Sequence, residues 1–423
     1  MVTQLQVRHQ SSAPQYDGRW SLETFFAIAY LTQGISSQFG LIAQPVQFLL
    51  MKGLSFSAAD VSTVMAILML PWLLKPFYGL ICDNFALFGY HRKSYLIAAH
   101  LFSIVALAVL AFVSAPYAIL LSLVANAGAM AVATALMLGL AAENGAKNGR
   151  TASYVSAQSF YYYLGNIGAV LGAGFLCQTL QPQTALNFAA ALAVIPVVFS
   201  TALCLTAVRE PKATEAPIQS QAETQSVWET LLSKPLWLLA GLAACWNFTP
   251  CFGVPLYFHE SNNLRFSQEL IGQLAAWNAV GMMSGALVYR DVLSRMAPFK
   301  RLYITAALWC ASILVYSLLA EPISAYPIEL FRGVCNTLEI LCLYELGAAY
   351  CCRTNAVTVM ALLLAARNIA HEFATLIGGN LFTHIFGNTF GPMVICGVLL
   401  PLASFALIPH IVAAQNRRRL HCQ

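Results

Sequence analysis

Charge is what this sequence has least of. Only 9% of its 423 residues are Asp, Glu, Lys or Arg, whereas 59% are hydrophobic and the mean hydropathy is +0.68. Soluble domains carry roughly 25% charged residues, and a soluble globule of this length needs a charged shell that this composition cannot supply. The scarcity excludes an ordinary soluble enzyme, a disordered chain and a nucleic-acid binder. A lipid bilayer is the solvent that suits such a chain.

Several motifs are also missing. The 12 cysteines include no Cys-x-x-Cys, and most of them fall in apolar runs, where cysteine behaves as a small hydrophobic residue. The sequence has no Gly-x-x-x-x-Gly-Lys-Ser/Thr phosphate loop, no His-Glu-x-x-His and no Gly-x-Ser-x-Gly. We therefore expect no metal, no cofactor, no ATP-driven step and no enzymatic activity. The polar residues 1–19 contain no apolar core followed by a cleavage site, so a signal peptide is not predicted.

Long apolar runs are what the sequence has in abundance. A membrane-spanning helix needs about 20 apolar residues, and twelve such runs occur. They lie near residues 22–48, 60–81, 94–113, 117–141, 153–177, 185–208, 235–257, 269–289, 301–319, 323–350, 356–382 and 390–413. We predict an all-α integral membrane protein of 12 transmembrane helices in two six-helix pseudo-symmetric halves, residues 1–208 and 235–423. The polar stretch 209–234 is the predicted cytoplasmic linker.

The distribution of Lys and Arg predicts the orientation, because positive residues concentrate in cytoplasmic loops. With both termini inside, 17 of the 22 Lys and Arg residues fall in cytoplasmic segments, and the outer loops hold only Lys52 and Arg265. The remaining three, Lys75, Arg332 and Arg367, lie within predicted spans. Compact loops fit a bacterial inner membrane. We therefore expect a multi-pass inner (plasma) membrane protein with both termini cytoplasmic.

Two pairs of glycines predict close helix contacts. Gly168-x-x-x-Gly172 lies in the fifth span and Gly281-x-x-x-Gly285 in the eighth. Small residues four apart let membrane helices approach closely. We expect these two spans, one from each half, to pack together through these glycines.

The end of the second span and the loop after it carry the most specific pattern. It reads Pro71-Trp72-x-x-Lys75-Pro76-x-Tyr78-Gly79-x-x-x-Asp83, and then Gly89-Tyr90-x-Arg92-Lys93-x-Tyr95. Gly79 permits close helix contact, and Asp83 can cap a neighbouring helix or pair with Arg92 or Lys93 on one side of the membrane. Such a contact stabilises one access state. We assign Lys75, Gly79, Asp83, Arg92 and Lys93 to gating; a solvated loop, with Lys75 reaching the interface, is the alternative.

This string resembles the signature of the folate–biopterin transporter family, a branch of the major facilitator superfamily. Tyr30-Leu31-Thr32-Gln33-Gly34 resembles the first helix of that family, and Arg367-Asn368 with Gly378-Gly379 resembles its eleventh helix. The resemblance implies a facilitator fold and transport of folates or pterins. Muropeptide permeases and siderophore importers carry a related string. The chain departs from the family in lacking an aspartate in the fourth span and an acid just before the eleventh, which leaves room for a different cargo.

Charged side chains inside a membrane are costly and usually face the protein interior. The tenth predicted span places Glu329, Arg332, Asn336 and Glu339 on one helix face. We expect Arg332 and Asn336 to bind an anionic substrate and Glu339 to accept a proton. A structural ion pair of Arg332 with Glu329 or Glu339 is the alternative.

The eleventh predicted span carries a second polar cluster. Arg367 and His371 are four residues apart, as are Asn368 and Glu372, so each pair shares a helix face. A histidine beside a carboxylate is suited to proton transfer near neutral pH. We assign His371 and Glu372 to proton coupling and Arg367 to substrate binding, with a structural hydrogen-bonded cluster as the alternative.

Uncharged polar and aromatic residues complete the predicted binding cavity. Amide groups can hydrogen-bond a substrate, and Tyr or Trp can stack on an aromatic heterocycle. The further residues assigned to substrate binding are Gln33, Gln158, Tyr162, Asn166, Trp246, Asn247, Trp277 and Asn278. Hydrogen bonding between helices and interfacial positions for the aromatic residues are the alternatives.

Together these features favour a proton-coupled secondary active transporter that imports a small anionic organic solute by alternating access. By resemblance the cargo is folate-like or pterin-like, and the alternative is ferric-siderophore or muropeptide import on the same scaffold. A more remote alternative is an integral-membrane enzyme built on Glu339, His371 and Glu372. The expected partners are the lipid bilayer, the anionic substrate and protons, without nucleic acid, and we expect a monomer.

Overall fold

The computed structural model describes residues 22–148, 151–208, 210, 234–350 and 356–413. Within these ranges the chain is built of helices, with no β-strand and a single isolated bridge between Leu87 and Tyr90. The all-α prediction is confirmed. Of the predicted linker, only Glu210 and Lys234 are among the described residues.

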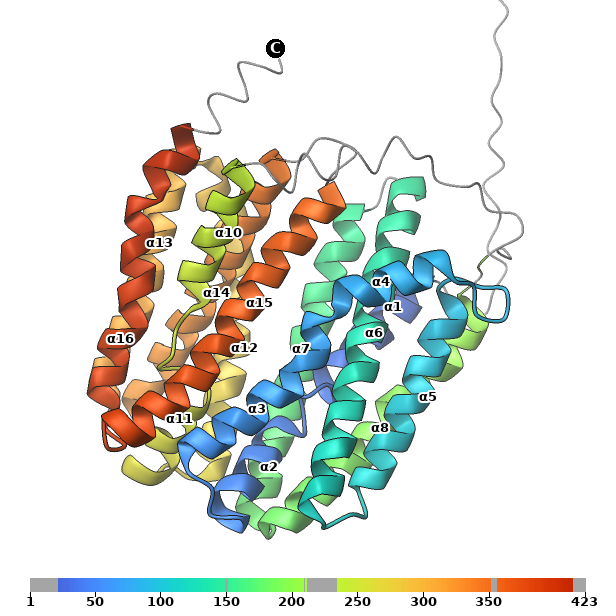
Figure 1. The fold of residues 1–423 in the computed structure, drawn as a ribbon, viewed down its shortest axis with the longest axis horizontal. Helices are drawn as coiled ribbons and strands as arrows, with labels where there is room; N and C mark the ends of the chain where they lie inside the picture. The colour runs from blue at the N-terminus through green and yellow to red at the C-terminus, as the bar shows by residue number, and fades with distance from the viewer. Residues whose placement is uncertain (1–21, 149–150, 209, 211–233, 351–355, 414–423) are drawn as a thin grey trace, which may run out of the picture.

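The first set of elements runs from the start of the described chain to Ala207. It consists of α1 (Leu22–Ser36), α2 (Ala43–Phe48), the π-helical turn η1 (Leu49–Gly53), α3 (Ala58–Leu73), α4 (Lys75–Asn84), α5 (Lys93–Leu110), α6 (Pro116–Asn148), α7 (Thr151–Thr179) and α8 (Pro182–Ala207). We call it the N-terminal set. In Figure 1 its blue-to-green helices gather on one side of the molecule.

The second set, the C-terminal set, lies beside the first. It consists of α10 (Lys234–Asn247), α11 (Val254–Phe258), η3 (His259–Asn263), α12 (Gln268–Asp291), η4 (Leu293–Arg295), α13 (Pro298–Leu314), η5 (Val315–Leu318), α14 (Pro322–Tyr350), α15 (Ala356–Asn380), η6 (Leu381–Ile385), α16 (Phe390–Ala403) and η7 (Ser404–Ala406). Its yellow-to-red helices occupy the other side of Figure 1.

Eight helices in the described part of the chain are long and apolar enough to cross a membrane by length and composition. The predicted spans that fall outside this group are interrupted or polar. The α14 helix has 29 residues, but Glu329, Arg332, Glu339 and Glu345 lower its hydropathy. The α14 span is therefore too polar to belong to this apolar group, because it contains charged side chains.

Two predicted spans are each divided into two helices. The predicted span 22–48 divides into α1 and α2, which are joined by a turn at residues 37–42. The predicted span 235–257 divides between α10 and α11. Gly253 precedes α11 with a φ of +71°, a conformation that side-chain-bearing residues rarely adopt.

Glycines bring the two sets into contact, but not the glycines that the sequence predicts. The α7 helix packs on α12 as expected, at Gly174 and Gly272: a methyl group built on Gly272 would lie 2.6 Å from the carbonyl oxygen of Val170. The expectation for Gly281 is wrong, because a methyl group there would meet the carbonyl oxygen of Leu330 in α14. Small residues thus set the spacing of both helix pairs, at different positions from those predicted.

The turn that leads into α3 is repeated at the start of α12. Leu54-x-Phe56-Ser57 follows η1, and Leu264-x-Phe266-Ser267 follows η3, 210 positions later in the sequence. In each copy the residue between Leu and Phe has a φ of 54°. The serine hydroxyl in each copy accepts a hydrogen bond from a backbone amide three residues on and so caps the helix, at 3.2 Å in the first copy and 3.1 Å in the second.

Candidate functional site

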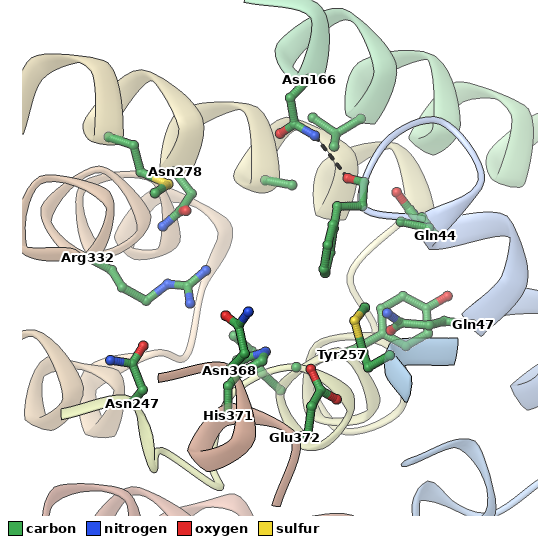
Figure 2. A pocket seen from close by; sticks show the side chains of 18 of the residues that line it. Gln44, Gln47, Asn166, Asn247, Tyr257, Asn278, Arg332, Asn368, His371 and Glu372 are labelled. Carbon is green, nitrogen blue, oxygen red and sulfur yellow. Dashed lines mark hydrogen bonds between the residues drawn. The ribbon is translucent and has the colours of Figure 1, made fainter. Parts of the chain in front are cut away.

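A cavity of about 630 Å³ lies between the two sets of helices. Its walls come from α2, α3, α4 and α7 on one side and from α10, α11, η3, α12, α14 and α15 on the other. Figure 2 shows polar side chains from several of these elements around the same space, among them Arg332, Asn278, Asn368 and Gln44. The volume lies in the range of pockets that enclose a drug-sized ligand.

Arg332 extends into this cavity from α14, and one of its nitrogens is bound by a carboxylate of the same helix. Its Nε lies 3.2 Å from Oε2 of Glu329, and the hydroxyl of Tyr316 donates a hydrogen bond to the other oxygen of that carboxylate. The guanidinium carbon lies 4.7 Å from the ring centre of Phe252. No described residue accepts a hydrogen bond from the terminal nitrogens of Arg332, which extends into the cavity in Figure 2. The ion pair therefore orients the arginine and leaves its outer donors available.

Arg367 from α15 is a second cation at the cavity, and it is paired more loosely. Its Nε lies 4.0 Å from Oε2 of Glu339, which is too long for a hydrogen bond. Neither of these two atoms has a hydrogen-bond partner among the described residues. The other oxygen of Glu339 accepts a hydrogen bond of 2.9 Å from the amide of Asn247. Glu339 is fully buried behind the cavity wall, whereas Arg367 and Asn247 line it.

The α15 helix adds Asn368, His371 and Glu372 to the same wall. His371 and Glu372 also line an adjoining side pocket of about 210 Å³. Figure 2 shows all three side chains on the same side of the cavity. The structure therefore brings Glu329 and Arg332 of the predicted α14 cluster to the same space as the predicted α15 cluster, whereas Glu339 of α14 lies behind the wall.

Three of the predicted amide residues and one tyrosine also line the cavity. Asn166 donates to the carbonyl oxygen of Phe39 at 2.9 Å, as the dashed line in Figure 2 shows. Asn278 donates to the carbonyl oxygen of Glu329 at 3.1 Å. Asn247, described above, and Tyr162 also line the cavity.

Five residues assigned to substrate binding from the sequence do not line this cavity: Gln33, Gln158, Trp246, Trp277 and Asn336. Gln33 is buried and donates to Thr134 at 2.8 Å. Trp246 is fully buried and donates to Ser404 at 2.8 Å. Trp277 has 44% of its surface exposed and lines a separate groove.

The predicted gating residues are dispersed around α4 and the start of α5. Lys75 lines the cavity, and its Nζ lies 3.8 Å from the ring centre of Trp72, close enough for a cation–π interaction. Among the described residues, no atom lies within 4 Å of a methyl group built on Gly79. Asp83 lies in α4, but its side chain lies outside what the structure describes, and its pairing with Arg92 or Lys93 stays a prediction.

A carboxylate that the sequence analysis overlooked binds the start of α5. The backbone amides of His91, Arg92 and Lys93 donate to Glu210, at 3.0, 3.0 and 2.8 Å. A carboxylate that accepts several amides at a helix N-terminus is stabilised by the helix dipole as well as by hydrogen bonds. In addition, Nζ of Lys93 donates to the carbonyl oxygen of Leu205 at 2.9 Å. The loop before α5 is thus tied to the end of α8.

Gln268, the first residue of α12, is the centre of a polar network between the two sets. From the N-terminal set, Gln44 donates to the backbone and side-chain oxygens of Gln268 at 2.8 and 3.1 Å. Gln178, also from that set, accepts from the backbone N–H of Gln268 at 3.0 Å. From the C-terminal set, Tyr257 donates to its side-chain oxygen at 2.8 Å and Ser261 accepts from its side-chain nitrogen at 3.0 Å. We call this network the Gln268 lock.

A second bridge lies beside this lock, where Nζ of Lys52 in η1 donates to the side-chain oxygen of Asn262 in η3 at 2.8 Å. The helices α2 and α11, which precede these two turns, lie toward the same end of the molecule in Figure 1. The repeated turns therefore form one end of the cavity, and polar contacts join the two sets there.

Glu260 in η3 also lines the cavity and was missed because the predicted span ended at residue 257. It is buried, with 5% of its surface exposed. The repeated Leu-x-Phe-Ser pattern is the signal that could have located it, since that pattern fixes the position of the turn that precedes α12.

Apolar helices of membrane-spanning length surround a cavity that contains two arginines, and solved transporters share this fold. A point mutant of the nucleoside transporter NupG matches with a TM-score of 0.73 and 14% sequence identity over 93% of this chain and 99% of that one. A D-xylose–proton symporter matches with a TM-score of 0.69 and 14% identity over 92% of this chain and 98% of that one.

Sequence comparison then gives the family: the chain belongs to the BT1 family, whose model matches residues 33–393. A folate-biopterin transporter of Synechocystis sp. is 25% identical over 414 residues, 92% of this chain and 82% of that protein. Probable folate-biopterin transporter 2 of Arabidopsis thaliana is 25% identical over 421 residues, 90% of this chain and 81% of that protein. The resemblance predicted from the sequence is confirmed, and the protein is a multi-pass membrane transporter and not an enzyme.

Proposed function

We propose that this transporter imports an anionic solute of the folate or pterin type across the inner membrane, by alternating access and together with protons. The observation that carries the proposal is Arg332, which is held at Nε by Glu329 and directs its terminal donors into the cavity. A guanidinium presented in this way suits a carboxylate, which it can bind through two parallel hydrogen bonds. The names of the relatives from Synechocystis and Arabidopsis supply the solute class.

The proposed architecture is 12 spans in two six-helix halves, residues 1–208 and 235–423, with residues 209–234 as the linker. Two findings support it: the two sets of helices lie on opposite sides of Figure 1, and the turns before α3 and α12 repeat at a constant offset. Four spans beyond the eight apolar helices come from α1–α2, α10–α11, α14 and α15. We place both termini in the cytoplasm, which puts η1 and η3 at the outer face.

In the proposed binding mode, Arg332 and Arg367 bind the carboxylates of the substrate. Tyr162, Asn166 and Asn278 line the remaining wall, and an aromatic ring with polar edges can stack and form hydrogen bonds there. Two arginines in one cavity favour a substrate with more than one acidic group.

Proton coupling is proposed for Glu339, His371 and Glu372. The 4.0 Å gap between Arg367 and Glu339 supports this role for Glu339. When a substrate carboxylate binds Arg367, Glu339 loses its nearest cation, and a buried carboxylate without a cation is stabilised by taking up a proton. When the substrate leaves, Arg367 returns to Glu339 and the proton is released.

Alternating access requires that the contacts at the two ends of the cavity form and break in turn. The Gln268 lock and the Lys52–Asn262 bridge join the two sets at the end proposed to be outer. We propose that the described conformation is closed to the outside. The predicted pairing of Asp83 with Arg92 or Lys93 would form in the opposite conformation.

A thermal-shift panel on the purified protein tests the proposal. The ligands are folic acid, biopterin, a ferric siderophore and a muropeptide. A ligand at 100 times its dissociation constant stabilises the bound state by about 2.7 kcal/mol, which raises the melting temperature measurably. A shift with folic acid, whose carboxylates can bind Arg332 and Arg367, is the expected result. A shift with biopterin alone, which has no carboxylate, would contradict the proposed binding mode. A shift with only the siderophore or the muropeptide would contradict the proposed substrate class.

A further inference from the structure

Glu260 occupies a place in the fold where an apolar residue suffices. In the repeated turn, Glu260 of η3 stands 210 positions after Leu50 of η1, as Phe266 does after Phe56. Leu50 and Glu260 are both buried, with 8% and 5% of their surfaces exposed. Burying a carboxylate costs free energy that burying a leucine does not. The turn therefore folds with a leucine at this position in η1, so folding of the turn does not by itself explain the glutamate in η3.

The surroundings of Glu260 contain one more acid than base. Its carboxylate interacts electrostatically with Glu329 and Arg332 of α14, and Tyr257 of α11 and Tyr316 of η5 also face it. Glu329 already holds Nε of Arg332. The side chain of Glu260 forms no hydrogen bond or ion pair with the described residues. With both acids ionised, the cluster carries one net negative charge before an anionic substrate binds.

We propose that Glu260 takes up a proton from water when an anionic substrate binds Arg332. The inference rests on the proposed function and adds a proton site to it. A substrate carboxylate brings one more negative charge to Arg332, and protonation of Glu260 restores the previous net charge of the cluster. No covalent bond of the substrate changes. Because linkage is reciprocal, the proton strengthens substrate binding by the same factor as the substrate strengthens proton binding.

The site at Glu260 is distinct from the one proposed at Glu339. Glu339 lies behind the wall and faces Arg367, whereas Glu260 lines the cavity, as Arg332 does, and interacts electrostatically with Arg332. The other titratable side chains of the cavity wall come from three helices: Lys75 from α4, Tyr162 and Tyr163 from α7, and His371 and Glu372 from α15.

The position of Glu260 also connects substrate binding to the end of the cavity. The next residues of η3 are Ser261, which accepts a hydrogen bond from Gln268, and Asn262, which accepts one from Lys52. A change of charge at Glu260 therefore occurs within the five-residue turn that joins the two sets. Protonation at this place can alter the stability of the closed end as well as the affinity for the substrate.

The test is the pH dependence of folic acid binding to the purified full-length protein between pH 6 and pH 8. The carboxylates of folic acid stay ionised throughout this range. Wild type should bind more tightly as the pH falls, approaching about a hundredfold per pH unit for two linked protons, one at Glu260 and one at the proposed Glu339 site. Glu260→Gln, which imitates the protonated acid, should lose the proton at Glu260, so its affinity should change about tenfold less per pH unit and at pH 8 should exceed that of wild type. Glu269→Gln, at an exposed position on α12, should follow the wild type.

A second variant separates the proton site from a folding defect. Glu260→Leu introduces the residue of the equivalent position in η1, so it should fold and should show the same reduced pH dependence as Glu260→Gln. The wild-type pH slope in either variant, or equal weakening of binding at every pH, would overturn the inference and leave the proposed function standing. Failure of the wild type itself to bind folic acid would overturn the proposed function and the inference with it.

Discussion

Arg367 and Glu339 face each other across 4.0 Å without a hydrogen bond, from Nε of one to Oε2 of the other. The neighbouring pair of Arg332 and Glu329 is closer, at 3.2 Å, and Tyr316 also donates to Glu329. One arginine is thus fixed by its acid, whereas the other can exchange its acid for a ligand. We therefore expect Arg332 to orient the substrate and Arg367 to exchange Glu339 for the substrate when the substrate binds.

Glu339→Gln should separate exchange from accumulation. The amide keeps the hydrogen bond partner of Asn247 but cannot carry the transported proton. We expect the variant to exchange labelled for unlabelled folic acid across proteoliposomes and to lose accumulation driven by a pH gradient. Glu321→Gln, at an exposed position before α14, is the control. Full gradient-driven accumulation by Glu339→Gln would exclude this residue from proton coupling.

Arg332→Ala should weaken folic acid binding by roughly tenfold to a hundredfold, the equivalent of the 1.5–3 kcal/mol typical of a hydrogen bond to a charged group. Calorimetry or equilibrium dialysis measures the change. Arg332→Lys retains the charge without the planar fork of donors and should recover part of the affinity. Arg290→Ala, at an exposed position on α12, should bind as the wild type does. Normal affinity in Arg332→Ala would place the anion elsewhere.

Gly272→Leu should prevent α7 and α12 from packing. Even a methyl group at this position would lie 2.6 Å from the carbonyl oxygen of Val170, and overpacking of this kind typically costs about 1–3 kcal/mol or more. We expect a lower melting temperature in detergent and loss of uptake. Gly168→Ala is the control. Gly168 lies on the same helix as Gly174, but no described atom lies within 4 Å of a methyl group built on Gly168, so this substitution should be tolerated. Equal effects of the two substitutions would argue against this contact.

Gln268→Leu should loosen the end of the cavity formed by the repeated turns. The substitution removes the side-chain contacts of Gln268 with Gln44, Tyr257 and Ser261. We expect faster amide hydrogen exchange in η1 and η3, measured by mass spectrometry, with unchanged exchange in η5. Gln183→Leu removes a glutamine that bonds within the N-terminal set and serves as the control. Unchanged exchange at η1 and η3 would show that the lock does not hold this end closed.

Much of the fold and part of the site could be predicted from the sequence. The scarcity of charge predicts a membrane protein, and the string from Pro71 to Tyr95 predicts the family. Charged residues within spans were located well, since Arg332, Arg367, His371 and Glu372 all line the cavity. The reason is physical: a charge inside a bilayer is tolerated mainly where protein or water surrounds it.

Uncharged residues were harder to place because an apolar helix shows little contrast between its faces. Lipid and a neighbouring helix are similar environments for Leu or Trp, so the sequence does not reveal that Trp246 faces Ser404 or that Trp277 lies outside the cavity. The glycine pairs failed for a related reason, since close approach depends on how two helices cross. Glu260 was missed although the repeated Leu-x-Phe-Ser turn identifies its position.

Concentrative uptake of an anionic solute through Arg332 is tested most directly by the accumulation of labelled folic acid in proteoliposomes. A pH gradient, acidic outside, is imposed and then dissipated with an uncoupler. The wild type should accumulate folic acid above the outside concentration, the uncoupler should abolish this accumulation, and Arg332→Ala should show none. Absence of accumulation by the wild type, or equal accumulation by Arg332→Ala, would show that the protein does not concentrate this anion through Arg332.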